Sequence, residues 1–207
     1  MTKIKLCGLS RPQDVEAANR LCPEYIGFVF APKSKRYVSP QRAKELKRLL
    51  TPGIQVVGVF VNEAPEHIAQ LLAEGVIDAA QLHGGESREY VARLRYLTQA
   101  PLFQAFSIAG PGDIQAAQES EADWVLLDSG PGGTGSAFDW ALLGEIRRPY
   151  FLAGGLTPQN VAQAVASLHP YGVDVSSGIE TLGKKAPDKM TAFVHAVRSI
   201  ERKEGTL

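Results

Sequence analysis

The chain has 207 residues, of which 44% are hydrophobic and 21% are charged, and its formal net charge is zero. This length and composition are typical of one globular domain with a sizeable core. The charge balance argues against a nucleic-acid partner or an acidic membrane surface. No apolar stretch approaches the ~20 residues of a membrane span, so we expect no membrane partner either.

The cysteine content and the N-terminal sequence indicate in which cellular compartment the protein is expected. Cys7 and Cys22 are the only two cysteines, which argues against a disulfide framework and is typical of a reducing compartment. The N-terminus shows no signal-peptide pattern, so we expect a cytoplasmic protein. No cysteine–histidine cluster has the spacing of a structural zinc site, and we therefore expect no metal.

Short apolar runs alternate with helix-like stretches along the whole chain, and we count eight of each. Several runs are apolar on both faces, as in a parallel sheet covered on both sides. Strands are predicted at residues 3–7, 25–30, 55–61, 79–83, 102–106, 124–128, 150–154 and 172–176.

The intervening stretches carry helix start signals. Ser39-Pro40 and Thr157-Pro158 place a capping oxygen before a proline suited to the first helical turn. Ala64-Pro65 opens a helix on the same logic, and residues 41–50 form a typical amphipathic outer helix.

This eightfold alternation predicts a (β/α)₈ TIM barrel that occupies residues 1–207 as a single domain. The main alternative is an open doubly wound sheet, which usually carries G-x-G-x-x-G near its first strand. No such motif follows residues 3–7. The glycine-rich stretch 130–135 is interpreted as a long loop after the sixth strand, and residues 132–135 are either an ordinary flexible loop or a lid.

Glycine-rich turns follow the last two predicted strands. Gly154-Gly155 ends the seventh run, and Ser177-Gly178 follows the eighth. Glycine lets backbone N–H groups approach a ligand closely, and a helix start adds a partial positive charge. In TIM barrels the loops after strands seven and eight hold substrate phosphate, so these turns predict a phosphorylated small-molecule ligand.

Chemically active side chains stand at or beyond the carboxyl ends of four other strands, where TIM-barrel active sites lie. Cys7 suits a general base if its thiol ionises, and Asp128 suits a proton donor if its carboxyl stays protonated. Arg36 suits bidentate recognition of a carboxylate. His83 either lines the pocket or satisfies backbone groups at its strand end. None of these strand ends carries a lysine, which weakens a Schiff-base mechanism.

A set of short motifs stands in order along nearly the whole chain. They are KLCGL (5–9), GFVF (27–30), SKRYV (34–38), QLHG (81–84), LD (127–128), GGTG (132–135), FDW (138–140), LAGGL (152–156) and GVDVSSGIE (172–180). Taken together, these motifs resemble those of phosphoribosylanthranilate isomerases. One departure stands after Gly183, where Ala186 and Pro187 precede the expected aspartate, at the cap of the last helix.

The resemblance implies a TIM-barrel enzyme of tryptophan biosynthesis, found in the family as a monomer or a homodimer. It implies the Amadori rearrangement of N-(5-phosphoribosyl)anthranilate to 1-(2-carboxyphenylamino)-1-deoxyribulose 5-phosphate, without a cofactor. By the family's pattern Cys7 is the general base, Asp128 the general acid, and Arg36 the anchor of the anthranilate carboxylate. The phosphate is expected on the backbone around Gly154, Gly155, Ser177 and Gly178.

Two other functions remain open at this point. The isomerase of histidine biosynthesis resembles a pair of half-barrels and uses two aspartates, one of them at the end of strand one, where this chain has Cys7. A non-catalytic phosphate-binding barrel would keep the glycine turns but could lose Cys7 or Asp128. A further hypothesis concerns Lys5, which shares strand parity with Cys7 and is expected to point into the barrel with Asp174 as its partner.

Overall fold

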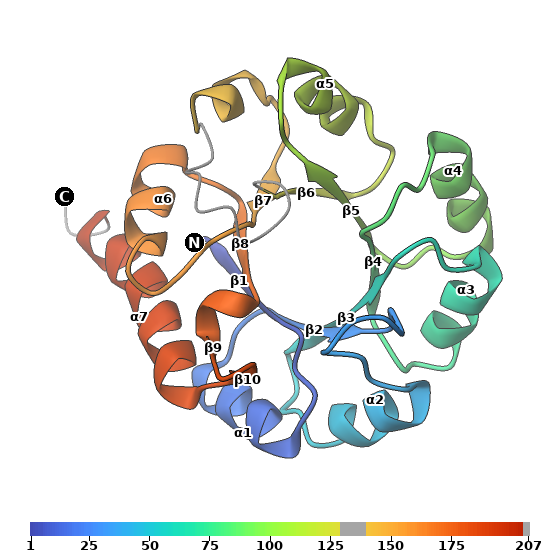
Figure 1. Cartoon of the computed structure of the whole chain (residues 1–207), viewed down its shortest axis with the longest axis horizontal. Helices are drawn as coiled ribbons and strands as arrows, with labels where there is room; N and C mark the ends of the chain where they lie inside the picture. Colours follow the sequence, from blue (N-terminus) through green and yellow to red (C-terminus); the bar gives the residue numbers. More distant parts are fainter. Residues whose placement is uncertain (129–139, 205–207) are drawn as a thin grey trace.

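The computed structural model describes residues 1–128 and 140–204. Eight parallel strands close into a barrel, each paired with its neighbours in chain order, and β8 returns to β1 (Figure 1). This confirms the predicted TIM barrel. The barrel strands are β1 (Lys3–Cys7), β2 (Tyr25–Val29), β3 (Gln55–Phe60), β4 (Ala79–Leu82), β5 (Leu102–Ser107), β6 (Trp124–Asp128), β7 (Tyr150–Leu152) and β8 (Gly172–Val175).

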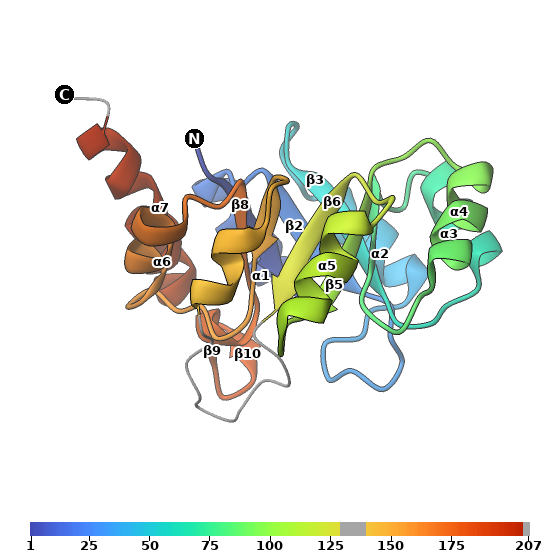
Figure 2. The same cartoon turned by 90° about the horizontal axis from the view of Figure 1, so that it is seen from above.

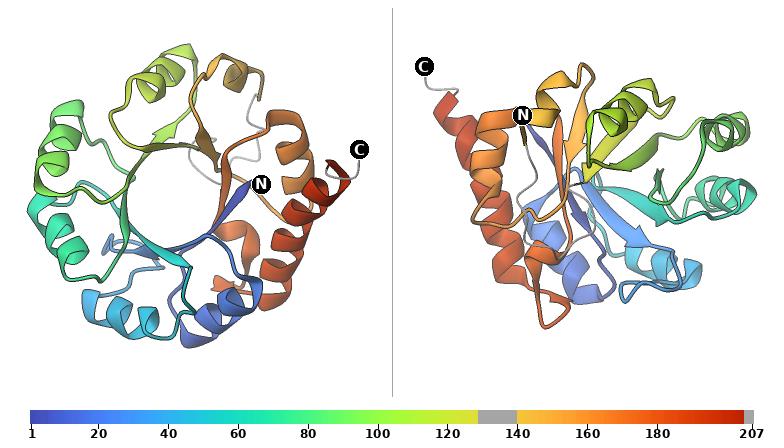
Figure 3. Two further views of the ribbon diagram at one scale, coloured as in Figure 1. Left: turned by 180° about the vertical axis from the view of Figure 1, so that it is seen from behind. Right: turned by 45° about the horizontal axis from the view of Figure 1, so that its top comes forward.

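Helices form a ring outside the strands, which is clearest from behind (Figure 3). A two-stranded hairpin of β9 (Glu180–Thr181) and β10 (Lys184–Lys185) lies on the same side of the barrel as the loop after β2 (Figure 2). The helices are α1 (Pro12–Leu21), α2 (Pro40–Lys47), α3 (Pro65–Ala73), α4 (Arg88–Leu97), α5 (Pro111–Glu119), α6 (Val161–Leu168) and α7 (Pro187–Glu204), with 3₁₀ turns η1 (Trp140–Glu145) and η2 (Ser177–Ile179).

The structure corrects some predicted element types and ends. Between β6 and β7 the described residues hold the 3₁₀ turn η1 instead of an eighth α-helix. β7 ends two residues before the predicted end, because Gly154 has a φ of +81° and leaves the extended conformation. The Ser39 cap is confirmed, since its side chain accepts from the N–H of Arg42 at 3.2 Å. The Thr157 cap is wrong: Thr157 opens a turn, and α6 begins after Asn160.

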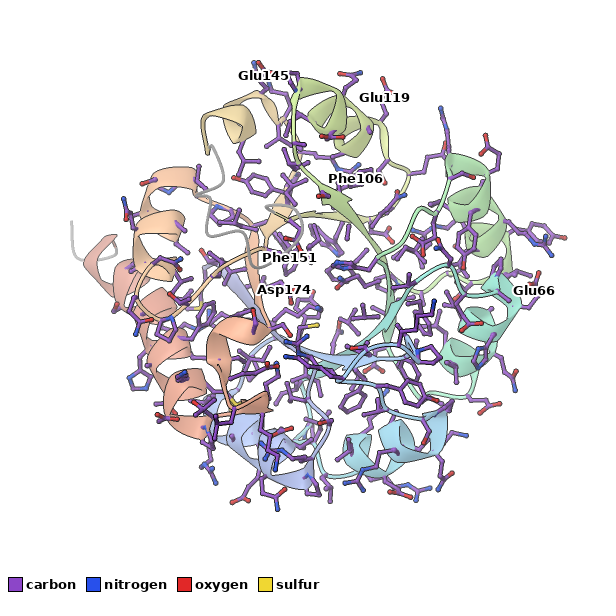
Figure 4. The ribbon with its side chains drawn as sticks, viewed as in Figure 1. Glu66, Phe106, Glu119, Glu145, Phe151 and Asp174 are labelled. Atoms are coloured by element: carbon purple, nitrogen blue, oxygen red, sulfur yellow. The ribbon has the colours of Figure 1, made fainter. Side chains whose placement is uncertain are left out.

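Two apolar layers stabilise the barrel. The larger one lies between the outer face of the sheet and the helices, as a sheet covered on both faces requires. The smaller one fills the interior, where Tyr25, Phe103 and Phe151 meet edge to face with ring centroids 5.1–5.8 Å apart. Phe151 lies near the middle of the barrel in Figure 4, whereas Glu66 and Glu119 are on the outer rim.

A buried ion pair joins the first and last strands of the barrel. Lys5 and Asp174 are register partners on β1 and β8, and Lys5 Nζ donates to Asp174 Oδ1 at 2.8 Å. The Lys5 side chain has no exposed surface, and Asp174 lies near the barrel centre (Figure 4). The predicted partner of Lys5 is confirmed.

Among the described residues no helix combines the length and apolarity that crossing a membrane requires. The loop at 132–135, with the hypothesis that it is a lid, lies outside the described residues.

The ion pair predicts a measurable cost in stability. Asp174→Leu leaves the Lys5 ammonium buried without its partner, so we expect the free energy of unfolding to fall by about 3–5 kcal/mol. A Lys5→Met/Asp174→Leu double variant removes both charges and should regain most of the loss. Urea unfolding measures both variants. Glu16→Ala, which removes an exposed pair with Arg20, is the control and should cost less than about 1 kcal/mol. An Asp174→Leu protein as stable as the unmodified one would contradict the prediction.

Candidate active site

A cavity of about 320 Å³ opens at the carboxyl ends of the barrel strands. It brings together side chains and turns that lie far apart in the sequence, including seven of the eight predicted site residues. Those seven are Cys7, Arg36, His83, Asp128, Gly154, Gly155 and Ser177.

The glycine turn after β7 forms one edge of the cavity. Gly154 and Gly155 have φ values of +81° and +61°, which side chains rarely adopt. Asn160 fixes the turn from outside: its Oδ1 accepts from the N–H of Thr157 at 2.8 Å, and its Nδ2 donates to the carbonyl of Gly155 at 3.0 Å. The N–H groups of Gly154, Gly155 and Ser177 make no hydrogen bond with another described residue. These donors are available to an anion.

Gly178, the eighth predicted site residue, lies behind this edge and is not among the residues that line the cavity. A Cβ at this position would overlap the carbonyl oxygen of Leu156 and lie 3.2 Å from the Cα of Thr157. The absence of a side chain therefore lets the turn after β8 pack directly against the turn after β7. Gly178 sets the distance between the two turns that form the anion edge.

Cys7 ends β1 at the floor of the cavity, and only 7% of its surface is exposed. Burial raises the pKa of the Cys7 thiol, because the charged thiolate loses its hydration. The positive charges of Lys5 and Lys185 act in the opposite direction, and the Asp174 carboxylate reinforces the rise. The pKa of Cys7 is raised overall, so the thiol stays protonated to a higher pH than a free cysteine does.

Asp128 ends β6 and lines the same cavity as Cys7, with β7 and β8 between their strands. Its Oδ2 lies 3.9 Å from Nε2 of His83, which follows β4. The imidazole and the carboxyl are thus neighbours in the lining of the cavity, and both are partly exposed, at 38% and 27% of the side chain. Among the described residues, no group of three or more His, Cys, Asp or Glu side chains could hold a metal ion.

Arg36 reaches the cavity from the loop after β2 and is held by a carboxylate. Its Nε and Nη2 donate to the two oxygens of Glu180 at 2.6 and 3.0 Å, a bidentate pair. Lys185 Nζ donates to the same carboxylate at 2.8 Å. Burial opposes ionisation of Glu180, but the hydrogen bonds from Arg36 and Lys185 outweigh it and hold its pKa at about 2. Glu180 stays charged and fixes the guanidinium.

Sequence reasoning assigned no role to two polar residues of the site, Gln81 and Glu180. Gln81 could have been found from strand parity, because it stands two residues before His83 on a predicted strand and must point to the same side. Glu180 gave no comparable signal. Its contact with Arg36 spans 144 positions of the chain and arises only when the hairpin folds beside the loop after β2.

Comparison with known proteins identifies the family. Residues 4–196 match the family model described as N-(5'phosphoribosyl)anthranilate (PRA) isomerase. A protein of Endomicrobium trichonymphae named N-(5'-phosphoribosyl)anthranilate isomerase is 43% identical, over 97% of this chain and 100% of its own length. A protein of the same name from Caldanaerobacter subterraneus is 41% identical over the same shares of the two chains.

Solved structures agree. Phosphoribosyl anthranilate isomerase from Thermotoga maritima superimposes with a TM-score of 0.87 at 35% identity, covering 96% of this chain and 100% of its own. A phosphoribosyl anthranilate isomerase in complex with reduced 1-(o-carboxyphenylamino)-1-deoxyribulose 5-phosphate gives a TM-score of 0.84 at 34% identity, with the same coverage. Since sequence and fold match over almost the entire length, this chain belongs to the phosphoribosylanthranilate isomerase family.

Proposed function

We propose that this chain catalyses the Amadori rearrangement of N-(5-phosphoribosyl)anthranilate to 1-(2-carboxyphenylamino)-1-deoxyribulose 5-phosphate in tryptophan biosynthesis. The reaction needs an acid, a base and anchors for two anionic groups. The observation that carries the proposal is that one cavity holds the Cys7 thiol and the Asp128 carboxyl beside a backbone anion edge. A non-catalytic phosphate-binding protein would need only the last of these.

Asp128 acts first, as general acid. Its protonated carboxyl donates to the ring oxygen of the ribose, the C–O bond breaks, and the ring opens to an iminium cation conjugated with the anthranilate nitrogen. His83, 3.9 Å away, is placed to donate a hydrogen bond to the carboxylate that remains. A carboxylate formed in a partly enclosed site gains more from such a donor than it would in water.

Cys7 acts second, as general base. The iminium makes the neighbouring C2 proton acidic, and the sulfur removes it to form an enolamine, which tautomerises to the ketone. The thiol must ionise for this step although burial raises its pKa. A cation that forms on the substrate beside the sulfur favours the thiolate, as Lys5 and Lys185 already do. Ring opening and activation of the base are thereby coupled.

The two ends of the substrate are held by different means. The phosphate binds the N–H groups of Gly154, Gly155 and Ser177, which make no hydrogen bond with another described residue. The anthranilate carboxylate binds Arg36. Because Nε and Nη2 of Arg36 already bind Glu180, the remaining face of the guanidinium, with Nη1, contacts the substrate.

The proposal extends to the molecule and its location. Eight strands that close one barrel support a single domain over residues 1–207. Cys22 is a free and exposed thiol, which is compatible with a reducing, cytoplasmic compartment.

The direct test is an assay of the purified protein with freshly prepared phosphoribosylanthranilate, followed by the fluorescence of the anthranilate group. Growth of a tryptophan auxotroph that lacks this isomerase is the second test. Absence of turnover and of complementation by a folded protein would overturn the proposed function.

The acid and base roles predict a loss of rate without a loss of binding. We expect Cys7→Ala and Asp128→Asn each to lower kcat by about 10²–10⁴-fold. The Kd for reduced 1-(o-carboxyphenylamino)-1-deoxyribulose 5-phosphate should change little, as titration calorimetry can measure. Cys22→Ala is the matched control and should retain the full rate. A near-normal kcat for either active-site variant would refute its role.

The carboxylate anchor predicts a change in KM. Arg36→Ala removes a charge-assisted contact to the substrate, so we expect KM to rise at least about tenfold. The neighbouring cation Lys35 lies 3.8 Å from Glu180 and is 64% exposed, and Lys35→Ala should leave KM nearly unchanged. Steady-state kinetics compares the two variants. An unchanged KM for Arg36→Ala would count against the assignment.

The packing of the two turns predicts weaker phosphate binding when Gly178 gains a methyl group. Gly178→Ala must push the β8 turn away from the carbonyl of Leu156. We expect inorganic phosphate to compete with the substrate at this edge, and its inhibition constant to rise several-fold in the variant. Gly112→Ala in α5, where a Cβ meets nothing within 4 Å, is the control. Equal inhibition of both variants by phosphate would show that the spacing of the turns does not matter.

A further inference from the structure

One of the side chains that line the cavity has a polar atom without a hydrogen-bond partner. Gln81 on β4 is only 1% exposed, and it lines the cavity with Cys7 and Asp128. Its Oε1 is the only buried side-chain nitrogen or oxygen in the described part of the chain that lacks a hydrogen bond. A buried acceptor without a donor costs about 1–3 kcal/mol, so native structures rarely keep one without a reason.

A second buried glutamine shows what a purely structural amide looks like here. Gln104 lies on the adjacent strand β5 and is 8% exposed. Its Nε2 donates to the carbonyl of Glu86 at 3.0 Å, and its Oε1 accepts from the hydroxyl of Ser120 at 2.6 Å. Both ends of Gln104 are satisfied by the protein, whereas only one end of Gln81 is.

The satisfied end of Gln81 fixes the proton on His83. Gln81 Nε2 lies 2.8 Å from Nδ1 of His83. If the amide were turned round, Oε1 would accept from Nδ1–H and neither N–H group of the buried amide would have a partner, which costs more than leaving the oxygen without a donor. The amide therefore donates to Nδ1, and the neutral ring carries its proton on Nε2, the nitrogen that faces Asp128.

We propose that Gln81 is a substrate-positioning residue, whose Oε1 accepts a hydrogen bond from a hydroxyl of the bound sugar while its Nε2 holds His83 in the Nε2–H tautomer. This inference rests on the proposed function, which supplies a ligand with hydroxyl groups in this cavity. One amide then connects the sugar to the imidazole beside the general acid. A misplaced sugar would therefore weaken the hydrogen bond at Oε1 and also disturb the one between Nε2 and His83.

The tautomer is tested without substrate. ¹⁵N NMR of the full chain distinguishes a protonated from an unprotonated ring nitrogen, and we expect the neutral ring of His83 to carry its proton on Nε2. Gln81→Glu replaces the donor by an acceptor and should move the proton to Nδ1. A proton on Nδ1 in the unmodified protein would overturn this half of the proposal.

The contact with the sugar is tested by pairing a protein variant with ligand variants. Calorimetry gives the Kd of reduced 1-(o-carboxyphenylamino)-1-deoxyribulose 5-phosphate and of analogues that each lack one hydroxyl. Gln81→Met keeps the side-chain length without polar atoms, and we expect it to raise the Kd of the parent ligand roughly tenfold. For one deoxy analogue the variant and the unmodified protein should bind alike, because the hydroxyl that Oε1 accepts from is missing.

Gln104→Met is the matched control: it should lower the midpoint of urea unfolding but leave every Kd unchanged. The same fold loss for Gln81→Met with all analogues would overturn the contact and reduce Gln81 to a packing role. Failure of the unmodified protein to bind the parent ligand would instead contradict the proposed function, and the contact with the sugar would fall with it.

Discussion

The barrel closes where β1 meets β8, and the buried pair of Lys5 and Asp174 lies on that seam. The Lys5 ammonium has no exposed surface there, so it depends on the Asp174 carboxylate, and their pairing helps to hold the two strands in one register. The same two strands deliver parts of the site: β1 ends in Cys7, and the turn with Ser177 follows β8. The interaction that completes the fold therefore also fixes the thiol relative to the anion edge.

Charge at this side of the cavity suits a ligand that is anionic at both ends. Lys5, Lys185 and Arg36 bring three positive charges, and Asp174 and Glu180 bring two negative ones. One positive charge remains, in surroundings where water is largely excluded and electrostatic effects are correspondingly stronger. The carboxylates orient the cations without cancelling them. In the proposed mechanism, these cations help the Cys7 thiol, whose pKa is raised by burial, to act as a base once a cationic intermediate forms beside it.

The repeating pattern of the sequence was sufficient to predict the barrel, because strands covered on both faces and amphipathic helices follow from local apolar spacing. The sequence pattern did not predict features that depend on contacts between distant segments. Asn160, and not Thr157, precedes α6, since its side chain is needed to close the glycine turn. Cys7 and Asp128 could be found because strand ends converge in this fold. Glu180 could not, because only the folded hairpin brings it to Arg36.

Along each strand, residues that pack the barrel interior and residues that line the cavity stand at opposite ends. β6 begins with Trp124 and ends with Asp128, two residues of equal parity that point to the same side. Toward the amino ends of the strands, rings such as Tyr25, Phe103 and Phe151 pack together as a buried aromatic cluster. At the carboxyl ends, small and polar side chains leave a cavity that a substrate can enter. The aromatic rings thus contribute buried apolar surface in the half of the barrel interior that the cavity does not occupy.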